Sequence, residues 1–190
     1  MSKNTALTTL YCSYTSLTTL DISKNTSLTE LNLCNNKLTE LDISNNIALT
    51  ELECYDNNLT ILNVSKNTVL KRLVCDQNKL TTLDVSNNIA LTYLECHTNQ
   101  LAILDVSNNP ALINLICFNN RLTSLDMSHN TELTELRCHF NKLTAEALNE
   151  TFTTLNENYD DDKRIYIGSN PGTSTCNWDI ATSKGWEIYK

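Results

Sequence analysis

The chain has 190 residues, a formal net charge of −8, and only 3 glycines and 2 prolines. The acidic balance argues against a nucleic-acid partner, which requires a basic stripe, and against attraction to an anionic membrane surface. No apolar run is long enough for membrane insertion, so we expect one elongated domain.

Residues 1–144 form about seven coils with a 21-residue period. Leucine recurs in columns that begin at Leu7 and Leu10, and a third column is mostly cysteine, with Leu33 in the second coil: Cys12, Cys54, Cys75, Cys96, Cys117 and Cys138. A fixed period in the twenties is the sequence sign of a solenoid. Apolar and polar residues alternate within each L-x-x-L-x-C segment. This predicts one short strand per coil, with parallel strands stacked at about 4.8 Å.

The column cysteines are predicted to be buried, reduced and unreactive, because a free cysteine behaves as a small hydrophobe. Parallel strands hold the Cβ vectors side by side, which makes disulfide geometry hard to reach. The column also lacks the paired spacings of a zinc site, so we expect no metal and no cofactor. Cys34 follows Leu33 and shifts by one position. We therefore expect Cys34 on the outward face and the first to react.

Two polar columns accompany the core. One holds asparagines, which we expect to satisfy the backbone groups of the turn that follows each strand: Asn36, Asn57, Asn78, Asn99, Asn120 and Asn141. The other holds aspartates, with Asn63 in one coil: Asp21, Asp42, Asp84, Asp105 and Asp126. A stack of carboxylates suggests metal binding. However, asparagine replaces aspartate once, and both accept from turn N–H groups, so we favour a turn role.

Residues 145–190 depart from the repeat. Near-helical spacing of Leu148, Phe152 and Leu155 predicts a helix in a longer coil, with Thr144 as its N-cap. Ile165 in "RIYIGSN" then aligns with Leu136 of the preceding strand. The last strand, "WEIY", is expected to resume the 21-residue period as a capping strand that places Trp186 opposite Ile165. Two tryptophans are expected to close the core: Trp186 and Trp178. The run at 160–162 lacks the alternating spacing of a calcium loop and is expected to be solvated.

The N-terminal end is expected to be uncovered. Only "MSKNTA" precedes the first core leucine, Leu7, and no apolar segment of a signal peptide is present. A solenoid normally needs a terminal cap. We therefore expect a piece of a longer protein, which frays in its first coil or associates through this end as a dimer.

The unit "LTELECYDNNLTILNVSKNTV" resembles the repeats of bacterial leucine-rich repeat proteins. Its strand cysteine is similar to that of the internalin J-like surface proteins. The resemblance implies a leucine-rich repeat solenoid of the α/β class. It also implies an extracellular or cell-surface binding module of adhesin type, and it brings no catalytic residue.

Side chains that point away from the core along the strands form the concave side of such a solenoid, here named the strand face. These positions vary between coils, carry more acidic than basic residues, and gain aromatic residues toward the later coils. Aromatic residues are enriched in interface hot spots, although strands also favour them. The candidates for ligand binding are Tyr55, Tyr93, His97, Ile116, Phe118, His139, Phe140, Glu53 and Glu95.

These observations predict a non-enzymatic module that binds a protein, host proteins included, through the strand face. The alternatives are a glycan ligand, because aromatic faces stack on sugars, and a structural spacer that displays another domain. No Ser/His/Asp or Cys/His set can be assembled. His97 and His139 lie two coils apart, about 10 Å by strand spacing, too far for a direct hydrogen bond.

Overall fold

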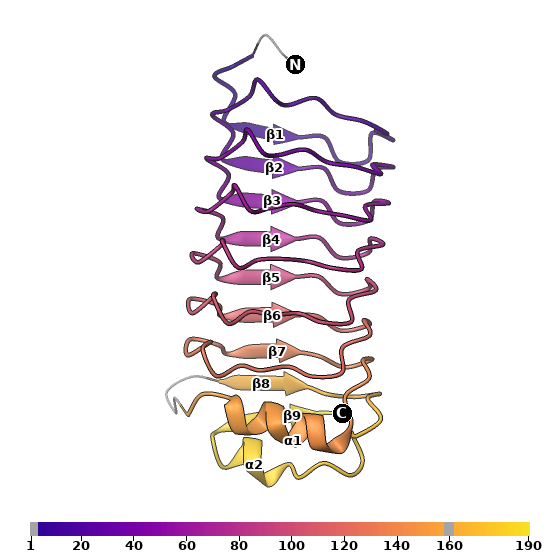
Figure 1. Cartoon of the computed structure of the whole chain (residues 1–190), viewed down its shortest axis with the longest axis vertical. Helices are drawn as coiled ribbons and strands as arrows, with labels where there is room; N and C mark the ends of the chain where they lie inside the picture. The colour runs from indigo at the N-terminus through magenta and orange to yellow at the C-terminus, as the bar shows by residue number, and fades with distance from the viewer. Residues whose placement is uncertain (1–3, 158–161) are drawn as a thin grey trace.

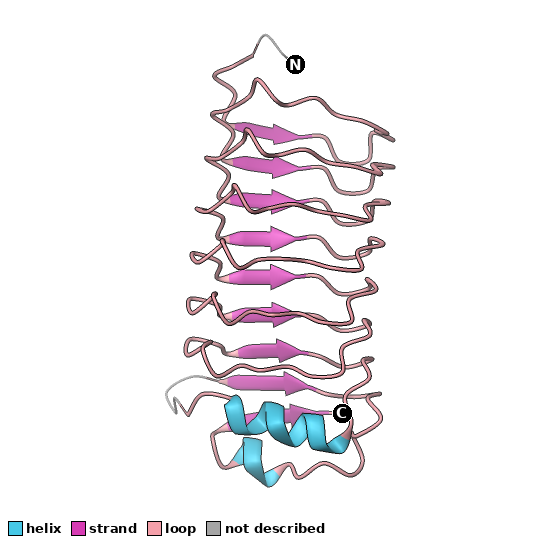
Figure 2. Ribbon diagram, in the orientation of Figure 1, coloured by secondary structure: helices cyan, strands magenta, loops and turns pink. Residues whose placement is uncertain are grey.

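The computed structural model describes residues 4–157 and 162–190 and forms one sheet of parallel strands, stacked in chain order (Figure 1). Each coil contributes one strand and returns through loops (Figure 2). The strands are β1 Thr9–Tyr11, β2 Glu30–Asn32, β3 Glu51–Glu53, β4 Arg72–Val74, β5 Tyr93–Glu95, β6 Asn114–Ile116, β7 Glu135–Arg137, β8 Lys163–Tyr166 and β9 Trp186–Tyr189. The predicted solenoid with one short strand per coil is confirmed.

The strand register follows the sequence alignment through β8 and then departs from it. Neighbouring strands from β1 to β7 pair in the register of the 21-residue period, and β8 pairs with β7 as predicted, with Leu136 opposite Ile165. The prediction for β9 was wrong, because Ile165 pairs with Ile188, and Trp186 lies opposite Lys163. The predicted and observed registers of β9 differ by two positions, so both keep the same side chains inward. The alternation of apolar and polar residues along the strand therefore does not distinguish them.

The core is a continuous stack of leucine, isoleucine and valine side chains that includes the cysteine column. Cys54, Cys75, Cys96, Cys117 and Cys138 are fully buried, and all eight cysteines of the chain are unpaired. Burial raises the pKa of each of these five thiols above its ordinary value, and that of Cys138 to about 12. Thiolate is the reactive form, so both access and ionisation oppose reaction.

The prediction for Cys34 was wrong. Its side chain is 1% exposed, and burial raises the pKa of its thiol to about 12. The reason lies in the next coil, where Tyr55 occupies the equivalent position and lies next to Cys34. A position that faces outward in a single strand is therefore covered by a large neighbour in the stack.

Thiol labelling of the native chain tests this placement. We expect Cys12, which is half-buried in the first coil, to react first, and Cys34 to react as slowly as Cys54. Mass spectrometry after short exposure to a thiol reagent would identify the labelled sites. Rapid modification of Cys34 in a chain that remains folded would contradict the structure.

The asparagines after the strands satisfy backbone groups of the turns, as predicted, and they also bridge successive coils. Asn99 donates from Nδ2 to the carbonyl oxygens of Cys75 and Cys96 at 3.1 Å each, and its Oδ1 accepts from the Leu80 N–H at 2.9 Å. The same pattern recurs at Asn57, and Asn170 extends it to the coil of β8. Each of these side chains therefore satisfies backbone groups of two coils, which ties the turns together along the solenoid.

A second asparagine column, which the sequence interpretation missed, precedes the strands. Its members are fully buried, and from the second coil onward each donates from Nδ2 to two backbone carbonyls of the preceding coil: Asn25, Asn46, Asn67, Asn88, Asn109 and Asn130. Their Oδ1 atoms have no hydrogen-bond partner. The column follows the repeat period without exception, so the signal was present in the sequence.

The aspartate column is turn structure, as predicted. Oδ1 of Asp84 accepts from the Ser86 N–H at 2.9 Å, and Asn63 makes the equivalent bond to Ser65 at 3.0 Å. The hydrogen bond from the Ser86 side chain is the largest cause of the lowered pKa of Asp84. Because the neutral amide of Asn63 makes the same hydrogen bond as the aspartates, the turn role of this column requires no metal ion.

The last two coils carry one helix each: α1 Ala145–Thr154 lies between β7 and β8, and α2 Asp179–Thr182 lies between β8 and β9. Thr144 caps α1 by accepting from the Ala147 N–H, as predicted, and α1 buries Leu148 and Phe152. Trp186 is buried, but Trp178 remains 37% exposed, so only one of the two tryptophans closes the core. Trp178 donates instead to Cys176 Sγ at 3.1 Å and lies under Lys190. Neither of the described helices has the length and apolar character to cross a membrane.

Of the run at 160–162, only Asp162 belongs to the described residues, and it is exposed.

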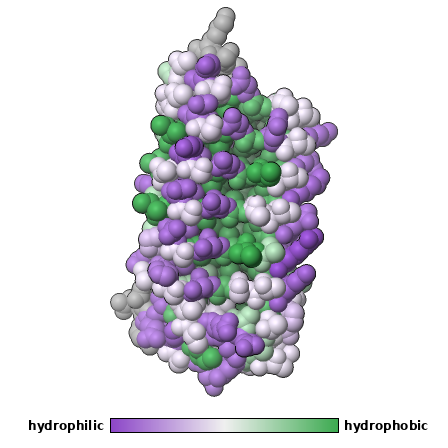
Figure 3. All heavy atoms as spheres, viewed as in Figure 1, coloured by the Kyte–Doolittle hydropathy of each residue, from purple (hydrophilic) through white to green (hydrophobic). Residues whose placement is uncertain are grey.

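Elsewhere on the surface, apolar side chains run along the long axis of one face between polar ones (Figure 3). Ile61 and Ile103 are exposed outside the strands and line shallow hollows. They provide reference positions away from the strand face.

Candidate recognition surface on the strand face

The strand face brings most of the sequence candidates into neighbouring rows. Tyr93 is the first residue of its strand. Three candidates end their strands, Glu53, Glu95 and Ile116, and four lie two positions beyond a strand end, in one row: Tyr55, His97, Phe118 and His139. Stacking places equivalent residues of successive coils side by side. Candidates that are far apart in the sequence therefore form a continuous surface.

Two candidates lie differently from the expectation. Ile116 is only 7% exposed, since it lies between the long side chains of Glu95 and Arg137 in the strand register. Phe140 is 57% exposed, but it lies three positions beyond the strand and has a left-handed backbone with φ 52°. The equivalent residue of each coil, such as Thr98, is also left-handed. Phe140 therefore belongs to the turn at the rim and not to a strand.

A stack of rings runs along the row beyond the strands. The His97 and Phe118 ring centroids lie 4.1 Å apart and those of Phe118 and His139 lie 4.3 Å apart, each pair with an interplanar angle of 12°. Phe140 meets His139 edge-on at 5.5 Å. Burial lowers the pKa of His139, and nearby Arg137 adds to the effect, so the neutral imidazole is favoured within the stack.

The aromatic surface continues onto two tyrosines that the sequence interpretation missed. Tyr166 lies 6.4 Å from His139, and Tyr166 stacks on Tyr189 at 4.6 Å. The alignment of "IYIGSN" with the repeats could have placed Tyr166 on the strand face. Tyr189 was hidden by the incorrect register of β9, which placed Glu187 beside Tyr166. Together with Phe140 and Lys190, these residues line a shallow hollow at the C-terminal end of the face.

Arginines on the face are paired with acidic residues and rings. Arg72 Nε lies 3.2 Å from Glu53 Oε1, and its guanidinium lies 4.1 Å from the Tyr93 ring centroid. Arg137 pairs with Glu135 in the same manner at 2.6 Å and lies over Tyr166. These pairings hold the two arginines on the strand face.

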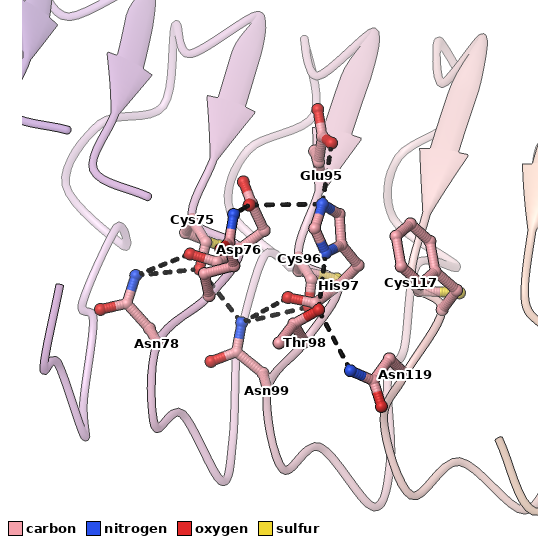
Figure 4. A network of polar contacts seen from close by, with 12 residues as sticks. Cys75, Asp76, Asn78, Glu95, Cys96, His97, Thr98, Asn99, Cys117 and Asn119 are labelled. Atoms are coloured by element: carbon pink, nitrogen blue, oxygen red, sulfur yellow. Dashed lines mark hydrogen bonds and ion pairs between the residues drawn. The ribbon is translucent and has the colours of Figure 1, made fainter. Parts of the chain in front are cut away.

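A compact polar cluster lies where the ring stack begins. His97 Nε2 is 3.3 Å from Asp76 Oδ2 and 3.2 Å from Glu95 Oε1, and His97 Nδ1 is 2.9 Å from Thr98 Oγ1 (Figure 4). Burial raises the pKa of Asp76, whereas the hydrogen bond from His97 lowers that of Glu95. Among the described residues, this is the group of histidine and carboxylate side chains whose ligand atoms could meet on one metal ion.

Known proteins share this architecture. A family model described as the LVIVD repeat matches residues 92–117, about one coil, and no curated protein matches the chain. Among solved structures, the functional domain of InlJ from Listeria monocytogenes, which includes a cysteine ladder, is 37% identical over 95% of this chain and 43% of its own, with a TM-score of 0.70. A leucine-rich repeat protein of Leptospira interrogans is 25% identical over 100% of this chain and 50% of its own, with a TM-score of 0.85.

An internalin, InlF, of Listeria monocytogenes is 25% identical over 79% of this chain and 47% of its own, with a TM-score of 0.70. The chain thus spans about half the length of these three structures. The three structures share the repeat fold of this chain, and InlJ also has a cysteine ladder.

Proposed function

We propose that this chain, a leucine-rich repeat solenoid with a cysteine ladder, is a non-enzymatic recognition module that binds a protein through the later coils of its strand face. The observation that carries the proposal is the ring surface formed by His97, Phe118, His139, Tyr166 and Tyr189. Folding does not require aromatic side chains at outward positions, and such residues dominate interface hot spots. The likeness to InlJ and an internalin supports a secreted or surface-displayed bacterial module of adhesin type.

The geometry of the stack favours a protein over a glycan. Sugars bind against open ring faces, but the Phe118 ring is covered on both faces by imidazoles at 4.1 and 4.3 Å. The tyrosine pair likewise covers one face of each of its rings. The stack therefore offers ring edges to a ligand, which suits the apolar and hydrogen-bonding side chains of a protein.

A substitution in the stack tests the proposal. The labelled chain would be screened against purified cell-surface and extracellular-matrix proteins and against a glycan array, and the ligand found would be titrated with Phe118→Ala. Loss of a hot-spot ring costs about 2 kcal/mol or more, so we expect at least tenfold weaker binding of a protein ligand. Urea denaturation would verify that the variant remains folded.

Ile103→Ala is the control, because it removes an exposed apolar side chain away from the strand face. It should leave the affinity unchanged. Unchanged binding by a folded Phe118→Ala chain would favour a spacer or another face. Binding confined to the glycan array would favour the glycan alternative.

A further inference from the structure

We propose that Asp76, Glu95 and His97 form a site for Zn²⁺ on the strand face, with one coordination position open to a water molecule or to a donor of a bound partner. The three side chains come from two adjacent coils: Asp76 follows β4, Glu95 ends β5, and His97 lies two positions beyond it. Their ligand atoms all lie within 4.8 Å of one another. Figure 4 shows both carboxylates directed at the imidazole of His97.

Two of the three separations between the ligand atoms match a tetrahedral zinc site, and all three lie within 4.8 Å. Zinc binds histidine nitrogen and carboxylate oxygen at about 2.0–2.2 Å, which places neighbouring ligand atoms roughly 3.3–3.6 Å apart. The observed separations from His97 Nε2 are 3.2 Å to Glu95 Oε1 and 3.3 Å to Asp76 Oδ2. An ion can therefore be accepted by small rotations of the carboxylates, without movement of the backbone.

Each ligand is held by a neighbouring side chain, as in metal sites whose outer partners orient the ligands. Thr98 Oγ1 can accept the Nδ1 proton of His97 at 2.9 Å, which leaves Nε2 as the metal-binding nitrogen. Tyr93 donates its hydroxyl to Glu95 Oε2 at 2.7 Å, and Gln77 Nε2 donates to Asp76 Oδ2 at 3.0 Å.

The charge of the cluster favours a cation. With a neutral imidazole the three ligands carry two negative charges, and the Asp76 side chain is only 5% exposed. Arg72, the cation that lines the same hollow, is paired with Glu53. A buried carboxylate without a compensating charge is costly, and a divalent ion at Nε2 would neutralise both carboxylates.

The ligand set selects zinc over the hard cations. Calcium takes six to eight oxygen ligands and magnesium demands octahedral oxygen, whereas an imidazole with two carboxylates suits Zn²⁺ with three protein ligands. The cluster lines a shallow hollow with Glu53, Tyr55 and Arg72, so the fourth position faces solvent. The sequence interpretation excluded metal because it sought paired motifs within one segment, while these ligands come from different coils.

Calorimetric titration of the chelator-treated, reduced full chain with ZnCl₂ at neutral pH tests the site. We expect one ion per chain. Both His97→Ala and Asp76→Asn should weaken binding at least about tenfold, since even outer partners of metal ligands contribute this much. His129→Ala is the matched control, because His129 is exposed and lies outside the cluster. It should bind zinc like the parent chain.

Cobalt substitution separates this site from the cysteines. With CoCl₂ we expect the weak visible bands of a four-coordinate ion with nitrogen and oxygen ligands, and no intense sulfur-to-cobalt charge-transfer band. The same spectrum should disappear in Asp76→Asn, whose fold would be verified by urea denaturation. Absence of zinc binding at millimolar concentration, equal binding by a folded His97→Ala chain, or a sulfur charge-transfer band would each overturn the proposal.

Discussion

Replacing Asn99 with alanine is expected to lower the free energy of unfolding by about 2–4 kcal/mol, because the change leaves the Leu80 N–H without its acceptor in a buried turn. An unsatisfied buried donor costs about 1–3 kcal/mol, and each further lost hydrogen bond costs about 0.5–1.5 kcal/mol. The carbonyls of Cys75 and Cys96 lose one donor each but retain Asn78 and Asn120. This sharing between successive asparagines limits the damage to neighbouring coils.

Urea denaturation would measure the loss, and three further variants identify its origin. Asn108→Ala removes an exposed asparagine of the same repeat and should change stability by less than about 0.5 kcal/mol. Asn88→Ala removes two Nδ2 bonds, and its Oδ1 has no partner to lose, so it should cost less than Asn99→Ala. Asn99→Asp preserves an acceptor for Leu80 but places a carboxylate against carbonyl oxygens. It should therefore be at least as destabilising as alanine, and a neutral effect would refute the donor role.

Features that repeat identically from coil to coil leave a periodic signal in the sequence, although the asparagine column before the strands was overlooked. The leucine columns predicted the register of β1 to β7, and the alternation predicted that Cys54 and Cys96 point into the core. Asn63 showed that the aspartate column serves the turn, because an amide cannot replace a carboxylate as freely in a metal site. In these cases one strand and its period contain all the information.

Features that depend on the neighbouring coil were not predicted. Cys34 is buried next to Tyr55 of the next coil, and Ile116 is buried because Glu95 and Arg137 flank it. The columns placed Asp76 and His97 in adjacent coils, but only side-chain directions reveal that two carboxylates share one imidazole nitrogen. The candidate site is formed by positions that vary from coil to coil. Because these residues do not repeat, the 21-residue period does not predict the contacts of their side chains.

The register of the last strand leads to a second large expected effect. Trp186 lies opposite Lys163, is 2% exposed, and donates from Nε1 to the Asn156 carbonyl at 3.1 Å. Trp186→Ala should therefore cost about 3–5 kcal/mol, the usual range for removing a buried large aromatic side chain. In a solenoid each coil contacts only its neighbours, so the loss should concentrate in the C-terminal coils.

Hydrogen exchange would locate the effect. We expect Trp186→Ala to lose amide protection in β8, β9 and α1, while β1 to β4 retain protection close to that of the parent chain. Trp178→Ala is the matched control, because Trp178 is 37% exposed and removing it opens no comparable cavity. Trp186→Phe should recover much of the lost stability, since most of the buried ring area is restored and only the bond to Asn156 is missing. If Trp178→Ala proved the more damaging of the two alanine variants, Trp186 would not be the residue that closes the core, and the register that places it opposite Lys163 would be wrong.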